Sequence, residues 1–93
     1  MIVRIATEGQ YELRGQALDE LDSADDALLD AIEAGDEAAF ARELAHVLEI
    51  VRTRGRRLDD DELEESDLVL PPPDTTLEEA RELFRSYPRN LVT

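Results

Sequence analysis

The hydrophobic positions between Asp36 and Gly55 form the longest regular pattern in the chain. They recur at spacings of three and four residues: Phe40, Leu44, Val47, Leu48 and Val51. This spacing places the apolar side chains on one face of an α-helix. Asp36 can cap the first turn of that helix, and Gly55 can end its last turn. We therefore expect residues 36–55 to form the central helix on which the rest of the chain packs.

A second helix is predicted between Gln16 and Ala34. Its apolar stripe consists of Leu18, Leu21, Ala24, Leu28 and Ile32, and its polar face, expected in water, of Asp22, Asp25, Asp26, Asp30 and Glu33. Ser23 followed by Asp26 can form an internal cap, which leaves a break near Ser23 open as an alternative. Because the connection to the next helix is so short, the two helices must run antiparallel to bury both stripes.

Three short segments have the character of β-strands. Residues 1–7 are rich in β-branched side chains, residues 11–14 alternate between apolar and polar, and residues 67–70 are apolar. The prolines at 71–73 forbid further ladder hydrogen bonds, so the third strand must end there. We expect the first two strands to form a hairpin and the third to add beside it.

The register of the hairpin depends on its loop. A three-residue loop at 8–10 would pair Ile5 with Leu13 and put the apolar side chains on one face. A two-residue loop would instead set Ile5 against Glu12. Because register follows the buried face, the three-residue loop is the prediction.

The C-terminal third begins with a charged connector, 56–65, in which Leu58 and Leu63 are candidate anchors. Thr76 and Glu79 then form a capping box that starts a third helix. The inner face of this helix is predicted to contain Leu77, Ala80, Leu83 and Phe84, with its end near Ser86 and at Pro88.

The order strand, strand, helix, helix, strand, helix predicts an α+β fold. We expect a two- to three-stranded sheet packed against an antiparallel helical hairpin and a short C-terminal helix. A chain of 93 residues has room for one core, so residues 1–88 should form a single domain, with 89–93 as a loosely ordered tail.

Charge and composition narrow the classes of partner. The chain has 24 acidic and 10 basic residues, all of the latter Arg, for a net charge of −14. This weighs against nucleic acid and against direct binding to an anionic membrane. A salt-adapted organism or a high-GC genome would each explain the composition. Cysteine is absent, and neither a signal peptide nor an apolar run near the ~18 residues of a membrane span is present, so we expect a soluble cytoplasmic protein.

Residues for catalysis or ligand binding are sparse. The single His46 lies beside the apolar stripe without a second ligand at metal-binding spacing, and the glycines are not clustered as a phosphate-binding loop requires. Residues 59–62 are the best metal candidate by charge, but they lack the alternating ligands and central Gly of an EF-hand. We therefore expect that the protein is not an enzyme and has no cofactor or metal. A small enzyme or cation-dependent module that uses residues 59–65 is the last-ranked alternative.

Four of the ten arginines lie within six positions at the end of the central helix: Arg52, Arg54, Arg56 and Arg57. One interpretation is structural, because cations are favourable at a helix C-terminus and the acidic residues that follow can fold back to neutralise them. The other is a partner-binding patch for an acidic protein, because guanidinium groups bind carboxylates bidentately. The structural interpretation is favoured, and the patch is kept as a hypothesis.

Three stretches can be compared with known families: MIVRI with EGQY, LDELDSADDALLDAIEAGDEAAF running on to VRTRG, and SDLVLPPPDTTLEEA. Together they resemble the PspA-associated protein family PspAA of phage-shock envelope-stress systems. The resemblance spans nearly the whole chain, and its last stretch is the most specific. The chain departs from the Gly-Leu-Ile-Pro-Gly-like ending of the family, which residues 87–93 replace.

The resemblance implies a non-enzymatic accessory protein that binds PspA, a coiled-coil, ESCRT-III-like protein that remodels or protects membranes under stress. It brings no catalytic residues, and it implies that any recruitment to the inner face of the membrane runs through this partner. The alternative is a self-associating structural module, because a small sheet would leave part of the helical stripes uncovered.

Overall fold

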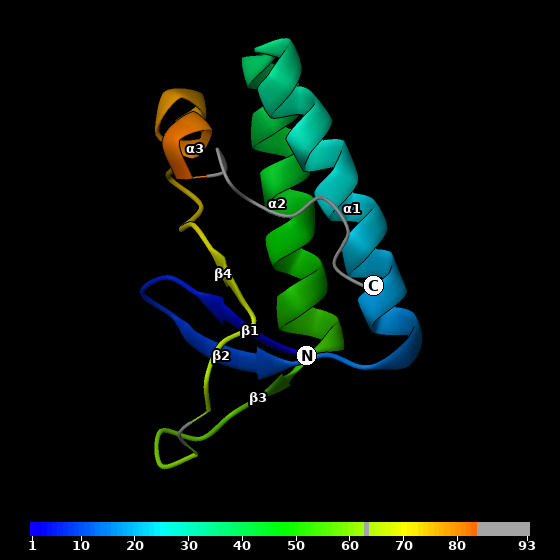
Figure 1. Ribbon diagram of the computed structural model, residues 1–93, viewed down its shortest axis with the longest axis vertical. Coiled ribbons are helices and arrows are strands. Elements are labelled where there is room, and N and C mark those ends of the chain that lie inside the picture. The colour runs from blue at the N-terminus through cyan, green and yellow to red at the C-terminus, as the bar shows by residue number, and fades with distance from the viewer. Residues whose placement is uncertain (63, 84–93) are drawn as a thin grey trace.

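The computed structural model describes residues 1–62 and 64–83, which form three helices and a four-stranded sheet (Figure 1). The elements are β1 (Ile2–Ile5), β2 (Gly9–Glu12), α1 (Gly15–Ala34), α2 (Glu37–Arg54), β3 (Arg56–Arg57), β4 (Leu68–Leu70) and α3 (Leu77–Leu83). The predicted α+β class is confirmed, with four strands in place of two or three.

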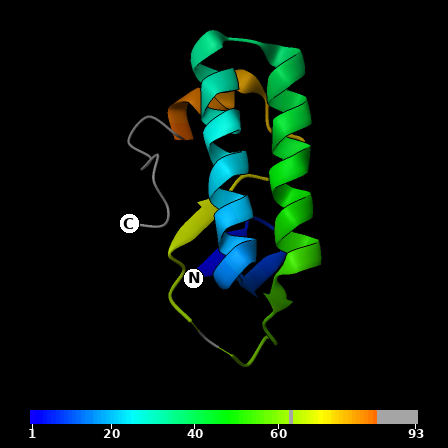
Figure 2. The same ribbon diagram turned by 90° about the vertical axis from the view of Figure 1, so that its right-hand side faces the viewer.

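The helices α1 and α2 lie side by side and run antiparallel, as predicted (Figures 1 and 2). Gly35 ends α1 in a left-handed conformation, with φ of 69°, and its N–H donates to the Ile32 carbonyl over 3.1 Å. The Asp36 side chain accepts a hydrogen bond of 3.0 Å from the Ala39 N–H and starts α2. No break occurs at Ser23, because α1 is continuous through it.

The buried face of α2 is the predicted one, whereas that of α1 is wider than predicted. All five stripe residues of α2 are buried, and Ile50 joins them. On α1, Asp25 is 0% exposed, so the prediction that it faces water is wrong. Leu29, which is also outside the predicted stripe, is buried as well. A helix with two neighbours buries more than one stripe, and α1 contacts both α2 and α3.

The sheet has the strand order β3-β2-β1-β4, and its register differs from the prediction. Ile5 pairs with Gly9 rather than with Leu13, so the three-residue loop is 6–8 and not 8–10. Thr7 takes a left-handed conformation in this loop, and the Glu8 N–H donates to the Ile5 carbonyl over 3.0 Å. The shift spans an even number of residues, so the same side chains still face the helices.

Strand β4 pairs with β1 in parallel, with Leu68 beside Val3, which confirms the predicted third strand. Strand β3 was not predicted and was expected to be part of the connector; it pairs antiparallel with β2. Since β3 and β4 lie at opposite edges of the sheet, residues 58–67 must pass from one edge to the other. Leu58 is buried as expected, and Leu63 lies outside the described residues.

The capping box of α3 is confirmed. The Glu79 N–H donates to Thr76 Oγ1 over 3.1 Å, and the Thr76 N–H donates to Glu79 Oε1 over 2.9 Å. Ala80 is buried, but Leu83 is 58% exposed and not on the inner face. At about 100° per residue, Leu83 is turned by about 120° from Leu77. Phe84, Ser86, Pro88 and the tail 89–93 lie outside the described residues.

Candidate functional site at the arginine cluster

The arginine cluster, defined as Arg52, Arg54, Arg56 and Arg57, lies where α2 passes into β3. Gly55 joins the two elements in an extended conformation, with φ of −91° and ψ of 158°. A Cβ atom at Gly55 would lie 2.6 Å from the Val51 carbonyl oxygen and 3.1 Å from side-chain atoms of Leu13 and Tyr11. Gly55 thus ends the helix as predicted, but close packing requires it there, and no left-handed turn is involved.

Two arginines of the cluster hold Glu8 at the tip of the β1–β2 hairpin. The Arg52 guanidinium binds both carboxylate oxygens of Glu8, with 3.1 Å between Nε and Oε2. Arg57 Nη2 donates to the Glu8 carbonyl over 2.7 Å. The hydrogen bonds from Arg52 lower the pKa of the Glu8 carboxyl below its ordinary value. The end of α2 is thereby fastened to the hairpin.

Arg57 also passes close over β2. Its Cζ atom lies 5.8 Å from the centroid of the Tyr11 ring, within cation–π range. A Cβ atom at Gly9 would lie 3.0 Å from Arg57 Nη2, and Gly9 has φ of 143°, which L side chains rarely adopt. Gly9 was predicted as a turn residue; it is instead the strand position that makes room for Arg57.

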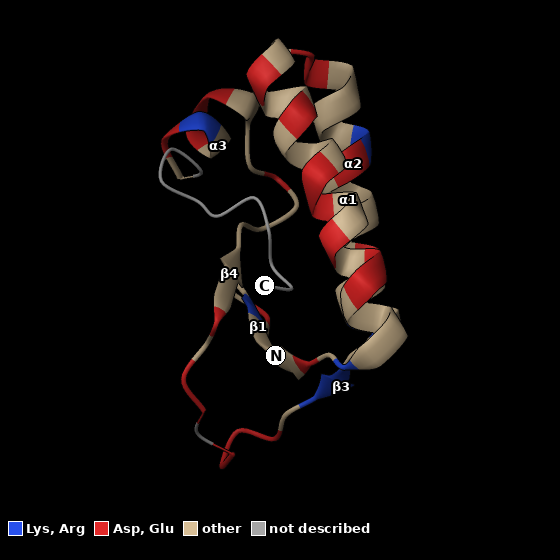
Figure 3. Ribbon diagram, turned by 45° about the vertical axis from the view of Figure 1, so that its right-hand side comes forward, with Lys and Arg blue, Asp and Glu red and all other residues tan. Residues whose placement is uncertain are grey.

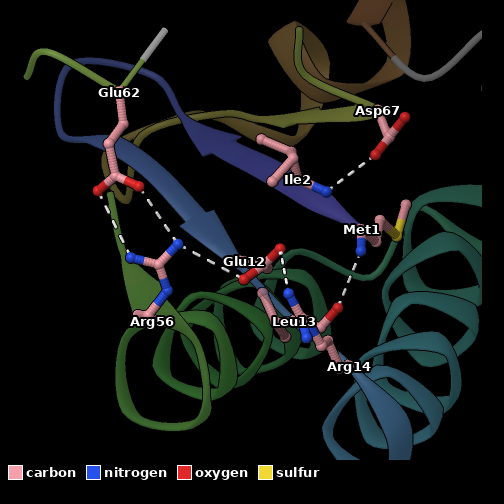
Figure 4. A network of polar contacts seen from close by, with 8 residues as sticks. All are labelled: Met1, Ile2, Glu12, Leu13, Arg14, Arg56, Glu62 and Asp67. Carbon is pink, nitrogen blue, oxygen red and sulfur yellow. Dashed lines mark hydrogen bonds and ion pairs between the residues drawn. The ribbon is translucent and has the colours of Figure 1, made fainter. Parts of the chain in front are cut away.

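Arg54 and Arg56 are tied to carboxylates of other elements. Arg54 Nη1 lies 2.8 Å from both carboxylate oxygens of Glu20 on α1. Arg56 lies between two carboxylates, 3.5 Å from Glu12 and 3.4 Å from Glu62 (Figure 4). Glu62 also accepts the Asp59 N–H over 2.9 Å; this hydrogen bond first, and Arg56 second, lower the pKa of Glu62.

The geometry bears on both interpretations of the cluster. Only Glu62 belongs to the acidic residues that follow the cluster in sequence; Glu8, Glu12 and Glu20 come from the hairpin and α1. The sequence contains no signal for these partners, because Arg52 and Glu8 are 44 positions apart. Arg56 remains 58% exposed and Arg54 45% exposed, so their outer edges are accessible.

The connector is fastened across the sheet by Gln10, which was not a candidate from the sequence. Gln10 is buried, and its Nε2 atom donates to the Glu64 carbonyl over 2.7 Å and to Ser66 Oγ over 2.8 Å. Asp67 continues the attachment, since its Oδ2 atom accepts the Ile2 N–H over 2.8 Å (Figure 4). Because Gln10 alternates with Tyr11, the connector lies on the sheet face opposite the helices.

The other features assessed in the sequence were a metal site, the single histidine and a membrane span. Among residues 1–62 and 64–83, no three His, Cys, Asp or Glu side chains are grouped so that they could hold a metal ion. His46 is exposed on α2. None of the helices in the described part of the chain is long and apolar enough to cross a membrane.

The contacts bring together segments that resemble one family. The EGQY segment receives Arg52 and Arg57 from the end of α2 and β3, and the strand in MIVRI pairs with the strand in SDLVL. Searches of curated proteins and of solved structures found no match to the chain. The family model of the PspA-associated protein, PspAA, matches residues 1–90. The chain therefore belongs to the PspA-associated protein family.

Proposed function

We propose that this protein is a non-enzymatic accessory that binds PspA or a related coiled-coil component of an envelope-stress system. The observation that carries the proposal is the family match over residues 1–90. The protein would act in the cytoplasm and would reach the inner face of the membrane through its partner. Its role would be to bind and regulate, with no catalytic residue and no cofactor.

The arginine cluster is the proposed contact with acidic side chains of the partner. The exposed edges of Arg54 and Arg56 can each donate hydrogen bonds to a further carboxylate. Arginine binds carboxylates through two parallel hydrogen bonds. Because both guanidiniums already have intramolecular partners, the gain on binding should be modest and should fall as salt screens it.

The experiment is a titration with the coiled-coil partner at several salt concentrations. The test variant is Arg54→Gln/Arg56→Gln, which leaves Arg52 and Arg57 to hold the hairpin. The matched control is Arg4→Gln/Arg14→Gln, which removes two exposed arginines that lie outside the cluster. We expect the dissociation constant to rise about tenfold for the test variant and less than about twofold for the control.

The outcomes separate the two parts of the proposal. No binding of the unaltered protein at high micromolar concentration would refute partner binding itself. Equal affinity of the two variants would leave partner binding intact and return the cluster to a purely structural role.

Self-association is a second candidate function. Among the described residues, the large hydrophobic side chains that are exposed are Val69 on β4 and Leu83 on α3. They offer apolar contacts to a second copy, although the net charge of −14 opposes association at low salt. Sedimentation over a concentration series tests this function, and a strict monomer at high salt would exclude it.

A further inference from the structure

A groove runs between α1 and α2 on the surface of the helical hairpin. It is open to solvent, has a volume of about 620 Å³, and its apolar lining consists of Ala24, Ala27 and Ile50. Ala24 is 5% exposed and Ile50 is 7% exposed, so they lie below the surface, whereas the lining residue His46 is exposed. The groove is hollow because α1 contributes two alanines where longer side chains would fill the space.

The groove is elongated along the helix axes. Its lining positions on α1 extend from Gln16 to Ala27, which is about 16 Å at the helical rise per residue. On α2 they extend from Glu43 to Ile50. A long, shallow groove with small apolar residues in its lining fits the apolar face of a helix, which docks through residues three and four positions apart.

The rim of the groove is acidic. Asp19 and Glu20 line it from α1, and Glu43 lines it from α2. Glu20 is paired with Arg54 and Glu43 with Arg42, so these two arginines offset part of the rim charge. Figure 3 shows acidic positions along much of α1, in a chain whose net charge is −14. The field around the groove therefore attracts a cationic segment and repels the acidic helices of a second copy.

We propose that this groove docks an amphipathic helix of a protein partner, with apolar residues on one face and Lys or Arg beside them. The apolar residues would cover Ala24, Ala27 and Ile50, and the cations would lie against Asp19 and Glu43. The identity of the partner rests on the proposed function, but the preference of the groove for a basic helix does not.

The groove and the arginine cluster meet at Glu20. Its carboxylate lines the groove and accepts both hydrogen bonds from Arg54. Arg54 therefore lies next to the groove, and a helix docked in the groove would pass close to the arginine cluster.

The test uses a designed helical peptide with Leu on one face and Lys on the other, titrated into the full chain. Ala27→Arg places a bulky cation in the groove, and Ala45→Arg makes the same change on the exposed face of α2, outside the groove. We expect Ala27→Arg to weaken binding about tenfold or more, and Ala45→Arg to weaken it less than about twofold. Both variants add one positive charge, so the effect of net charge on peptide binding is the same in each.

Several results would overturn the inference. The unaltered chain could fail to bind the Leu and Lys peptide, or the Ala27→Arg and Ala45→Arg variants could bind it with equal affinity. A peptide with Glu in place of Lys could also bind the unaltered chain as tightly as the Leu and Lys peptide. A shift from dimer to monomer in the Ala27→Arg variant would assign the groove to a second copy instead.

Two further measurements keep the test decisive. If Ala27→Arg has a much lower melting temperature than the unaltered protein, the double variant Asp19→Asn/Glu43→Gln replaces it. Its control is Asp61→Asn/Glu65→Gln on the connector, which removes the same amount of charge. The first pair should weaken peptide binding and flatten its salt dependence, and the second should do neither. Binding of the coiled-coil partner is measured separately, so a protein that binds the peptide but not the partner would refute the proposed function alone.

Discussion

At the residue scale, Gly55 controls the joint between α2 and the sheet. Its backbone is ordinary extended chain, so an alanine would be tolerated if space allowed. Space does not allow it, because a Cβ atom would lie 2.6 Å from the Val51 carbonyl oxygen. The neighbouring atoms are backbone and core side chains, which cannot move aside without disturbing the packing.

We predict that Gly55→Ala lowers the free energy of unfolding by ~1–3 kcal/mol, the usual cost of overpacking. Chemical denaturation measures this, with Gly15→Ala for comparison. Gly15 has φ of 57° but nothing within 4 Å of the added Cβ atom, so its variant reports backbone strain alone. Equal stability of Gly55→Ala and the unaltered protein would show that the joint can relax.

Glu8 is the residue whose titration should report the attachment of α2 to the hairpin. Hydrogen bonds from Arg52 lower the pKa of Glu8 below its unfolded value of about 4.5. A carboxyl with a lowered folded pKa stabilises the fold above the unfolded pKa, and this contribution is lost as pH falls through the folded pKa. Its removal should therefore matter at neutral pH and not in acid.

The prediction is that Glu8→Gln is less stable than the unaltered protein at pH 7, and that the difference shrinks as pH falls below about 4.5. Removing any carboxylate also relieves repulsion in this acidic chain. Glu65→Gln, on the exposed connector, measures that relief. Its change in the free energy of unfolding is subtracted from that of Glu8→Gln. A difference that does not change between neutral pH and acid would contradict the assigned role of the Glu8 carboxylate.

At the scale of elements, most of the features that the sequence predicted are formed by neighbours in the chain, and the pairing of β4 with β1 is the exception. The helical stripe of α2, the cap at Asp36 and the capping box at Thr76 each depend on residues a few positions apart. The strand β3 depends on the pairing of Arg57 with Tyr11 across the sheet, for which no local pattern exists. The register of the hairpin is local, but its loop at 6–8 uses a left-handed conformation at Thr7, which a β-branched residue rarely adopts.

The same division holds for the candidate site. The sequence located the arginine cluster, because the four side chains are close in the chain. It could not show that Glu8 and Glu20 would hold Arg52 and Arg54, or that α1 and α2 would leave a groove between them. Those features arise only when separate elements pack together.

The connector offers a prediction at the element scale, because the buried Gln10 side chain is one of the groups that fasten it to the sheet. Gln10→Ala removes both hydrogen bonds, to Glu64 and Ser66, and should cost ~1–3 kcal/mol. Trypsin should then cut faster after Arg57, at the start of the released segment. Gln16→Ala, at an exposed position, is the control, and equal cleavage rates for the two variants would rule out this role of Gln10.

At the scale of the whole molecule, 24 acidic residues lie in a chain whose radius of gyration is 12.6 Å. Ten arginines can neutralise at most ten of them, so 24 − 10 = 14 negative charges repel one another. Salt screens this repulsion over the Debye length, about 10 Å at 0.1 M and about 3 Å at 1 M. It also screens the exposed ion pairs of the arginine cluster, but each of these contributes little.

We therefore predict that the melting temperature rises as NaCl is raised from low concentration to about 1 M. Asp61→Asn/Glu65→Gln, which carries two fewer negative charges, should show a smaller rise. A flat or falling melting temperature would mean that the ion pairs outweigh the general repulsion. Salt has the opposite effect on docking of a basic helix, which it should weaken. Fold and binding therefore have different salt optima, and partner titrations belong at the lowest salt at which the protein is fully folded.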